Sequence, residues 1–342
     1  MIPHSRPVFG QPFSHAVQQV VASGQVAMGE ETLLLEQRIA SLLGRKFAMG
    51  VDSGTSAISL ALRALMQHRP VKKVGIPAYT CSSVLYAVLA VGCKPVCMDC
   101  GEDLRLIPDV ALQQAASLDA VVLVHPFGMV EPLASESWPC PVIEDIAQSA
   151  GAELNGKPVG GFGDITAASF YATKPWGGAY GGMVLSDEEE LSSAVISMRD
   201  PDAASSLQPY VGHHQLSDVH AVMANVRLGL ANEERRARRG HALAMDEWFE
   251  SDEVRPVAGL QNGNGYRYII RTPNDAERWI ERMRRSGVRA ARPVQTPISR
   301  LLAVEASGAE SAWQDCVSIP MLTDATEKEM EYIREAIEIC MN

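Results

Sequence analysis

Apolar runs and helically spaced apolar positions alternate along the first half of the chain. Short apolar runs predict strands, and apolar residues repeated at intervals of three and four predict helices. The expected strands are 47–51, 73–76, 94–98, 120–124 and 142–143. The expected helices are 13–23, 30–43, 58–66 and 80–91. Strands that alternate with helices indicate an α/β fold with a mostly parallel sheet covered on both faces.

The pattern changes in the second half of the chain. An apolar run at 165–172, a strand at 181–185 and a helix at 187–198 come first, and residues 200–216 are polar and irregular. One long helix is expected over 217–249, bent or broken near Gly229. Beyond residue 250 the expected strands are 266–271, 288–291 and 316–319, and the expected helices are 274–286 and 326–341.

This change of pattern predicts three parts. Residues 1–12 carry three prolines and little periodicity, which indicates an extended arm. We expect a large domain over 13–240 and a small C-terminal α+β domain over 241–342. A length of 342 residues is ample for two domains.

Composition narrows the class of protein. A net charge of −11 argues against a nucleic-acid-binding surface. No apolar run approaches the roughly 20 residues that span a bilayer, and the first residues lack the apolar core of a signal peptide. Seven cysteines without a C-x-x-C pair favour buried, reduced thiols over a metal site. We therefore expect a cytoplasmic protein that binds no metal, nucleic acid or membrane.

One stretch, 142–182, holds the candidate chemistry. The acid pair Glu144-Asp145 ends an apolar strand, and Gln148 follows one helical turn later. A Gly-rich turn and a second apolar run then lead to a single lysine, Lys174. An amine for a Schiff base and a carboxylate that keeps a ring nitrogen protonated are the two groups that pyridoxal phosphate (PLP) requires.

A second stretch, Asp52 to Ala57, joins a predicted strand to a predicted helix through Gly, Ser and Thr. Such a turn can bind an anion, because the first N–H groups of a helix are unpaired and the helix dipole is positive there. An ordinary Ser/Thr helix cap explains the same residues. The carboxyl ends of parallel strands meet at one edge, so Gly54, His125, Asp145 and Lys174 should gather there. No G-x-G-x-x-G follows the first strand, which argues against an NAD site.

Several motifs together resemble the DegT/DnrJ/StrS family of sugar aminotransferases. They are SGTSA at 53–57, PAYTCSSVLYAVLAVGCKPVCMD at 77–99, EDIAQSAGA at 144–152 and GFGDITAASFYATK at 161–174, with RP at 6–7 and SIPMLTDATEKEMEYI at 318–333. The resemblance implies a fold-type-I PLP enzyme with a seven-stranded sheet in its large domain. It also implies a homodimer with active sites at the interface. Members usually move an amino group from glutamate to a keto group on a nucleotide-linked sugar.

The resemblance also implies roles for individual residues. Lys174 would hold PLP and act as the acid and base of the proton shift, and Asp145 would bond the pyridine nitrogen. Gln148 would lie against the cofactor ring or its phenolic oxygen. The phosphate would be bound by Gly54, Thr55, Ser56 and Ser169. A lysine at this position argues against the family's dehydratase offshoot, which lacks it.

Some positions depart from the family pattern. Cys81 stands where members place an aromatic residue on the cofactor ring, and Tyr86 stands where asparagine is common. His213 and Gln215 fall in the stretch whose asparagine usually reaches the partner subunit's phosphate, so His213, or the nearby His214, is the expected donor there. Tyr180 replaces a usual glutamate.

We call these departing positions the rim of the expected site. Because the rim is altered, alternatives stay open beside amino transfer to a nucleotide-linked keto sugar. One is a different PLP reaction, such as elimination or aldol cleavage, or a non-sugar substrate on the same scaffold. Another is a PLP-binding regulatory protein. The presence of Lys174, Asp145 and Gln148 together favours an enzyme.

Overall fold

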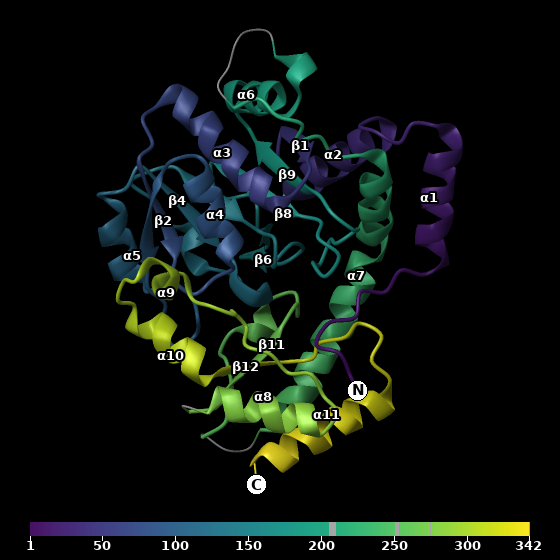
Figure 1. Ribbon diagram of the computed structural model, residues 1–342, viewed down its shortest axis with the longest axis vertical. Coiled ribbons are helices and arrows are strands. Elements are labelled where there is room, and N and C mark those ends of the chain that lie inside the picture. The colour runs from purple at the N-terminus through teal and green to yellow at the C-terminus, as the bar shows by residue number, and fades with distance from the viewer. Residues whose placement is uncertain (205–209, 250–252, 274, 342) are drawn as a thin grey trace.

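The computed structural model describes residues 1–204, 210–249, 253–273 and 275–341, arranged as Figure 1 shows. Its large sheet contains β1 (Phe47–Val51), β2 (Lys73–Pro77), β3 (Lys94–Met98), β4 (Ala120–Val124), β5 (Val142–Asp145), β8 (Ile165–Ser169) and β9 (Gly182–Ser186). The strand order is β1-β9-β8-β5-β4-β2-β3. β9 is antiparallel to both of its neighbours, and the other pairs are parallel. The predicted mostly parallel sheet is confirmed.

Helices cover both faces of this sheet. On one face α3 (Gly54–His68), α4 (Ser82–Ala90) and α6 (Glu189–Arg199) share a core with alternate strand residues. On the other face, α2 (Glu30–Leu43) and α7 (Asp218–Asp246) pack on β8 and β9, and α5 (Pro108–Ala115) packs beside β4. Residues of one strand, such as Val122 and Leu123, therefore enter different cores, as a sheet buried on both faces requires.

The C-terminal part forms a smaller α+β unit. Its antiparallel sheet contains β10 (Arg255–Pro256), β11 (Tyr268–Arg271) and β12 (Cys316–Ile319). The helices α8 (Ala276–Arg285) and α11 (Glu327–Met341) share a core with it that includes Ile269, Trp279 and Ile337. Two short helices that the pattern did not predict, α9 (Ile298–Leu302) and α10 (Ser307–Asp315), lead into β12. A short hairpin, β6 (Glu153–Leu154) and β7 (Lys157–Pro158), follows β5.

Two expectations about the second half, a strand at 288–291 and a break in the long helix, are wrong, whereas a bend of that helix stays a prediction. The predicted strand at 288–291 is only a pair of isolated bridges, Val288 to Ile2 and Ala291 to Ser318, because its two ends pair with different segments. The long helix α7 is continuous across Gly229, where an added Cβ would meet open space, so the glycine alone does not interrupt it. The predicted start of the helix at residue 274 lies outside the described residues.

The N-terminal arm runs along the C-terminal unit before it reaches α1 (Gln11–Ser23), which packs on α7 (Figure 1). Ile2 exchanges backbone hydrogen bonds with Gly287 and Arg289, and Arg6 forms ion pairs with Asp324 and Glu329. The arm is therefore held on the C-terminal unit by both backbone hydrogen bonds and ion pairs. The domain limits at residues 12 and 240 stay a prediction, and α7 passes through the second of them.

Candidate active site

Two neighbouring cavities meet at Lys174. The first, about 360 Å³, we call the strand-end cavity; its lining includes Gly54, Thr55, Cys81, Asp145, Gln148, Ser169, Tyr180 and Lys174. The second, about 450 Å³, we call the loop cavity; its lining includes Cys81, Tyr86, Gln148, Lys174, Tyr266, Arg267 and residues 293–296. Seven of the nine residues predicted to bind the cofactor thus line one cavity at the carboxyl edge of the sheet.

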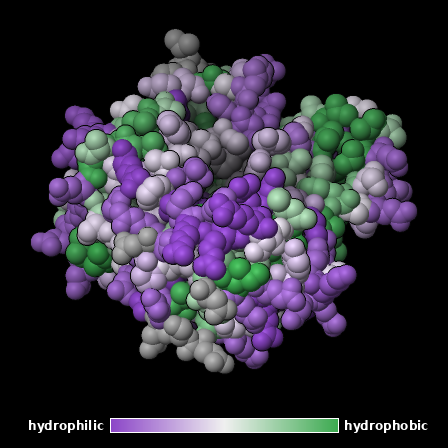
Figure 2. All heavy atoms as spheres, turned by 60° about the horizontal axis from the view of Figure 1, so that its bottom comes forward, coloured by the Kyte–Doolittle hydropathy of each residue, from purple (hydrophilic) through white to green (hydrophobic). Residues whose placement is uncertain are grey.

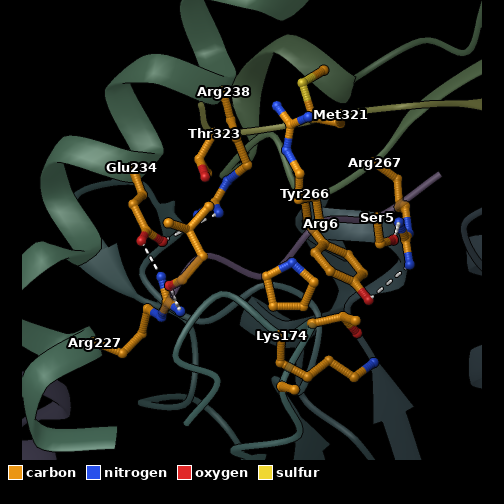
Figure 3. Close-up of a pocket in the computed structure, with 14 residues that line it drawn as sticks. Ser5, Arg6, Lys174, Arg227, Glu234, Arg238, Tyr266, Arg267, Met321 and Thr323 are labelled. Carbon is orange, nitrogen blue, oxygen red and sulfur yellow. Dashed lines mark hydrogen bonds and ion pairs between the residues drawn. The ribbon is translucent and has the colours of Figure 1, made fainter. Parts of the chain in front are cut away.

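Lys174 lies in a tight turn after β8. Its N–H donates to the carbonyl of Tyr171 and its own carbonyl accepts from Gly177, both at 2.8 Å. A Cβ on Gly177 would lie 2.4 Å from the carbonyl oxygen of Tyr171, so this turn requires glycine. The lysine Nζ lies 5.3 Å from the centroid of the Tyr266 ring, and Figure 3 shows the two side chains next to each other. Lys174 lines both cavities.

Asp145 ends β5 and is buried, with 6% of its surface exposed. Burial raises the pKa of this carboxyl, and the N–H of Ala147 and the charge of Lys174 offset part of the rise. Among the described residues, Ala147 N is its one recorded hydrogen-bond donor, at 2.9 Å from Oδ1. A buried carboxyl with so few donors has capacity for a cationic N–H from a ligand.

Gln148 is held by the turn that follows β4. Its Oε1 accepts the N–H of Phe127 at 2.7 Å, and Phe127 has the left-handed φ of 58° that bulky residues rarely adopt. With its carbonyl oxygen engaged, the side chain has its amide N–H groups left to donate within the cavity. Gln148 therefore both supports a strained turn and offers a donor at the site.

At the start of α3 the helix-cap and anion-site interpretations coexist. Ser53 caps the helix, accepting the N–H of Ser56 at 3.1 Å, and its hydroxyl donates to that of Ser56 at 2.9 Å. Ser56 is consequently engaged in the cap and is not among the residues that line the cavity. Gly54 and Thr55 do line it. A Cβ on Gly54 would lie 2.7 Å from Cβ of Ser169, so glycine permits α3 and β8 to meet.

The altered rim positions divide into two groups. Cys81 is exposed at the N-terminus of α4 and lines both cavities, and Tyr180 lies edge-on to Tyr171, with ring centroids 5.5 Å apart. His213 is exposed and lies outside both linings, while His214 Nδ1 is 3.2 Å from Oδ2 of Asp52. The role predicted for His213 concerns a partner's phosphate, and it stays a prediction.

The other half of the acid pair, Glu144, faces away from the cavity. It accepts hydrogen bonds from His125 Nε2 and from the N–H groups of Gly160, Phe162 and Gly163. Burial alone would raise the pKa of this carboxyl, but these donors lower it to about 2. Glu144 thus fixes the Gly-rich turn, and His125, which follows β4, is its buried hydrogen-bond partner.

Tyr266 and Arg267 were not predicted. Both line the loop cavity, and Arg267 Nη2 donates to Tyr266 Oη at 3.2 Å (Figure 3). Burial alone would raise the pKa of the Tyr266 phenol, but the charges of Lys174 and Arg267 and hydrogen bonds with Thr173 and Lys174 lower it. In the sequence these residues look like the start of an ordinary strand, so no local signal marks them.

The described residues contain neither a metal-binding cluster nor a membrane-spanning helix. No three or more of their His, Cys, Asp and Glu side chains are grouped so as to hold a metal ion. None of the helices they form has the length and apolar character of a membrane span.

Comparison with known proteins identifies the family. A curated relative from Acidithiobacillus ferrooxidans, a UDP-N-acetyl-3-dehydro-alpha-D-glucosamine 3-aminotransferase, is 31% identical in an alignment of 252 residues, and the match covers 67% of each chain. Two further curated relatives are matched over about half of their length.

Solved structures agree in fold. An aminotransferase from Brucella abortus named for DegT, DnrJ, EryC1 and StrS superimposes with a TM-score of 0.85 at 24% identity, over 96% of this chain and 94% of that one. A GDP-4-keto-6-deoxymannose-3-dehydratase with bound GDP-perosamine has a TM-score of 0.89 at 17% identity, over 98% and 100%. These likenesses confirm the fold-type-I architecture.

A sequence model of the family matches residues 9–338, nearly the whole chain. The resemblance drawn from the motifs is confirmed: this chain belongs to the DegT/DnrJ/EryC1/StrS aminotransferase family.

Proposed function

We propose that the chain is a PLP-dependent aminotransferase that moves an amino group from an amino acid, with glutamate as the preferred donor, to a keto sugar carried on a nucleotide. One observation carries this proposal: the amine of Lys174 and the carboxyl of Asp145 line the same cavity beside the N-terminus of α3. Membership of an aminotransferase family supports the reaction. The name of the relative from Acidithiobacillus ferrooxidans supports a nucleotide-linked sugar.

The residues of the strand-end cavity fit PLP. Asp145 has capacity for a ring N–H, and the first turn of α3, with Gly54 and Thr55, presents N–H groups to a phosphate. The cavity volume of about 360 Å³ suits a small cofactor. Cys81 has no ring to stack on the cofactor. The binding free energy of PLP therefore lacks a stacking contribution of about 0.5–1.5 kcal/mol, which does not prevent binding.

Bound PLP supplies an aldehyde that condenses with amines and a ring that accepts electrons. Lys174 would hold it covalently and, once released, move the proton at the donor's α-carbon. Asp145, ionised opposite the ring nitrogen, would keep that nitrogen protonated. Gln148 would donate its amide to the phenolic oxygen, and Ser169 its hydroxyl to the phosphate.

The test is spectroscopic and chemical. Purified protein mixed with PLP should show the visible band of a lysine-linked cofactor, and borohydride reduction should label residue 174 in a peptide map. Lys174→Ala should remove the band and the label. Glutamate should convert wild type to the amino form of the cofactor, and a keto sugar nucleotide should reverse the change. A label on any residue other than Lys174 contradicts the proposal.

Product analysis separates the alternatives. A keto acid formed without an aminated sugar indicates elimination or another PLP reaction. PLP binding with no response to any amino donor indicates a regulatory role. Deoxygenation of the sugar instead of amination indicates dehydratase chemistry.

The remaining expectations concern assembly and location. Apolar side chains gather on the projecting α1 lobe in Figure 2, and Val21, Leu33, Leu34 and Leu42 are all more than two-fifths exposed. We propose that a second copy covers this surface in a homodimer with shared active sites. All seven cysteines are free thiols, which supports a cytoplasmic location. Light scattering of the purified protein tests the dimer.

A further inference from the structure

Asn264 is completely buried, with 0% of its surface exposed, although it lies in the loop that leads to β11. Its Nδ2 donates to the carbonyl oxygens of Gln148 and Ala150, both at 3.0 Å. Its Oδ1 accepts the N–H of Tyr266 at 2.9 Å. The reverse orientation of the amide would set its oxygen against two carbonyl oxygens. The side chain therefore has one orientation in which its polar atoms are satisfied.

The backbone around Asn264 lies directly against the turn that follows β4. The N–H of Asn264 donates to the carbonyl of Gly128 at 2.9 Å. A few residues further on, the N–H of Arg267 donates to the carbonyl of Phe127 at 3.2 Å. A Cβ on Gly128 would lie 2.5 Å from Asn264 Oδ1, and a Cβ on Gly263 would overlap the carbonyl oxygen of Gly128. Glycines on both segments therefore permit this close approach.

The contacts of Asn264 reach two sides of Lys174. Gln148 lines both cavities, and its side chain is the proposed donor to the phenolic oxygen of the cofactor. Tyr266 lines the loop cavity, and the centroid of its ring lies 5.3 Å from Lys174 Nζ, close enough for a cation–π contact (Figure 3). Asn264 itself lines neither cavity. It therefore contacts one residue proposed to meet the cofactor and one residue beside the reactive amine.

The hydrogen bonds of Asn264 act on the backbone from which these side chains extend. An Oδ1 that accepts the N–H two residues further on forms an Asx turn, which sets the direction of the chain at Tyr266. The two Nδ2 bonds hold the carbonyls of the turn after β5. Loss of the side chain would remove a partner from three buried backbone groups, so both segments would have to shift. A displacement of about 1 Å at reacting groups can lower a rate by about 100-fold.

We propose that Asn264 is a positioning residue of the reaction. It fixes the backbone of Gln148 on one side and that of Tyr266 on the other, and so sets both side chains relative to Lys174. The inference rests on the proposed function and adds to it a residue that touches neither cofactor nor substrate.

Asn225 provides a matched control. It is 6% exposed, and its side chain also makes three hydrogen bonds. Its Nδ2 donates to the carbonyl oxygen and to a carboxylate oxygen of Glu31, and its Oδ1 accepts from Arg38 Nη1. Both partners belong to α2, and Asn225 lines neither cavity. Asn264→Ala and Asn225→Ala thus remove the same chemical group from two buried places, one of them beside the site.

The experiment compares full-length wild type, Asn264→Ala, Asn264→Ser and Asn225→Ala. Absorbance gives the wavelength of the visible band of the PLP-loaded proteins, and stopped-flow absorbance gives the rate constant of their conversion by L-glutamate. The cofactor-free proteins are treated with formaldehyde and cyanoborohydride, and peptide mapping follows methylation of Lys174. Melting temperatures report stability. Asn264→Ser, whose hydroxyl can still accept the N–H of Tyr266, serves if Asn264→Ala does not fold.

We expect Asn264→Ala to shift the visible band, because Gln148 moves relative to the proposed phenolic oxygen. Conversion by glutamate should slow by about 10- to 100-fold. Methylation of Lys174 should become about two- to tenfold faster, since the cation–π contact of its amine with Tyr266 is lost. Asn264→Ser should show the same changes to a smaller degree. Asn225→Ala should lower the melting temperature and leave the band, the conversion and the methylation as in wild type.

The inference is overturned if folded Asn264→Ala keeps either the wild-type band or the wild-type methylation of Lys174, since Asn264 would then fix at most one of the two side chains. Equal changes in Asn264→Ala and Asn225→Ala also overturn it, because the effects would then follow general stability. If wild type takes up no PLP, the proposed function fails, and methylation of Lys174 in the cofactor-free proteins alone decides the inference.

Discussion

The strand-end cavity and the loop cavity share Lys174 but are built in different ways. The strand-end cavity takes most of its polar groups from turns that directly follow β1, β5 and β8. The loop cavity takes Tyr266 and Arg267 from the segment before β11, and its far wall from residues 293–296. The sheet therefore fixes the proposed cofactor groups, whereas long-range packing places the groups that would meet a substrate.

The two cavities should consequently respond to different substitutions. A change at a strand end should alter cofactor binding or chemistry, and a change in the loop supports should alter substrate affinity. The predictions below test that separation, beginning with the largest expected effect.

Asp145→Asn should have the largest effect on catalysis. It keeps the shape of the side chain but removes the negative charge opposite the proposed ring nitrogen, so amino transfer should fall by about 100- to 1,000-fold. Stopped-flow measurement of the half-reaction with glutamate gives the rate, and urea unfolding gives stability. A variant that retains full activity would remove Asp145 from the proposed chemistry.

Glu144→Gln, one residue away, should instead affect stability. It removes a buried carboxylate that accepts four hydrogen bonds, and the free energy of unfolding should fall by about 3 kcal/mol at pH 7. Because the pKa of Glu144 is lowered from 4.5 to about 2, its contribution is complete above pH 4.5 and disappears as the pH falls toward 2. Urea midpoints between pH 7 and pH 3 should show this acid-dependent loss in wild type and a smaller one in the variant.

Gly54→Ala should weaken the cofactor side alone. The new Cβ would lie 2.7 Å from Cβ of Ser169, and forcing α3 and β8 apart should cost about 1–3 kcal/mol, measured as PLP affinity by titration. Gly240→Ala is the matched control, since its Cβ meets nothing within 4 Å inside α7. That control should raise the free energy of unfolding by up to about 1 kcal/mol. Equal PLP affinities in the two variants would refute the close-packing argument.

Trp313→Ala should weaken the substrate side alone. The Trp313 ring is stacked between Arg292 and Arg300, with guanidinium carbons 3.9 and 3.6 Å from its centroid, and its Nε1 donates to the carbonyl of Gln295. Loss of contacts worth about 0.5–1 kcal/mol each should raise KM for the acceptor by roughly three- to tenfold. PLP affinity should be unchanged. A drop in PLP affinity without a change in KM would contradict the proposal that the two cavities respond to different substitutions.

The same division explains what could be predicted from the sequence. Asp145, Gln148 and Lys174 lie at strand ends, and a parallel sheet brings strand ends to one edge whatever the rest of the chain does. The sequence places Ser56 in the turn before α3 but does not decide its role, because a helix cap and an anion site use the same types of residue. Its hydroxyl accepts a hydrogen bond from the hydroxyl of the capping Ser53, and its predicted contact with a phosphate stays a prediction.

Other features depend on contacts that no local pattern records. Tyr266 and Arg267 reach the site because the loop before β11 packs against the turn at Phe127 and Gly128. The segment 288–291 has strand-like composition but lies between two different partners, so it forms bridges rather than a strand. The role predicted for His213 concerns the phosphate of a partner subunit, and it stays a prediction.

The opening beside Lys174 that Figure 3 shows is lined by both Ser5 and Thr323. During synthesis the first of these leaves the ribosome long before the second is translated. The nascent chain therefore holds Ser5 without this neighbour until Thr323 has emerged. Completion of the surroundings of Lys174 should thus be a late event in synthesis, however early the large sheet forms.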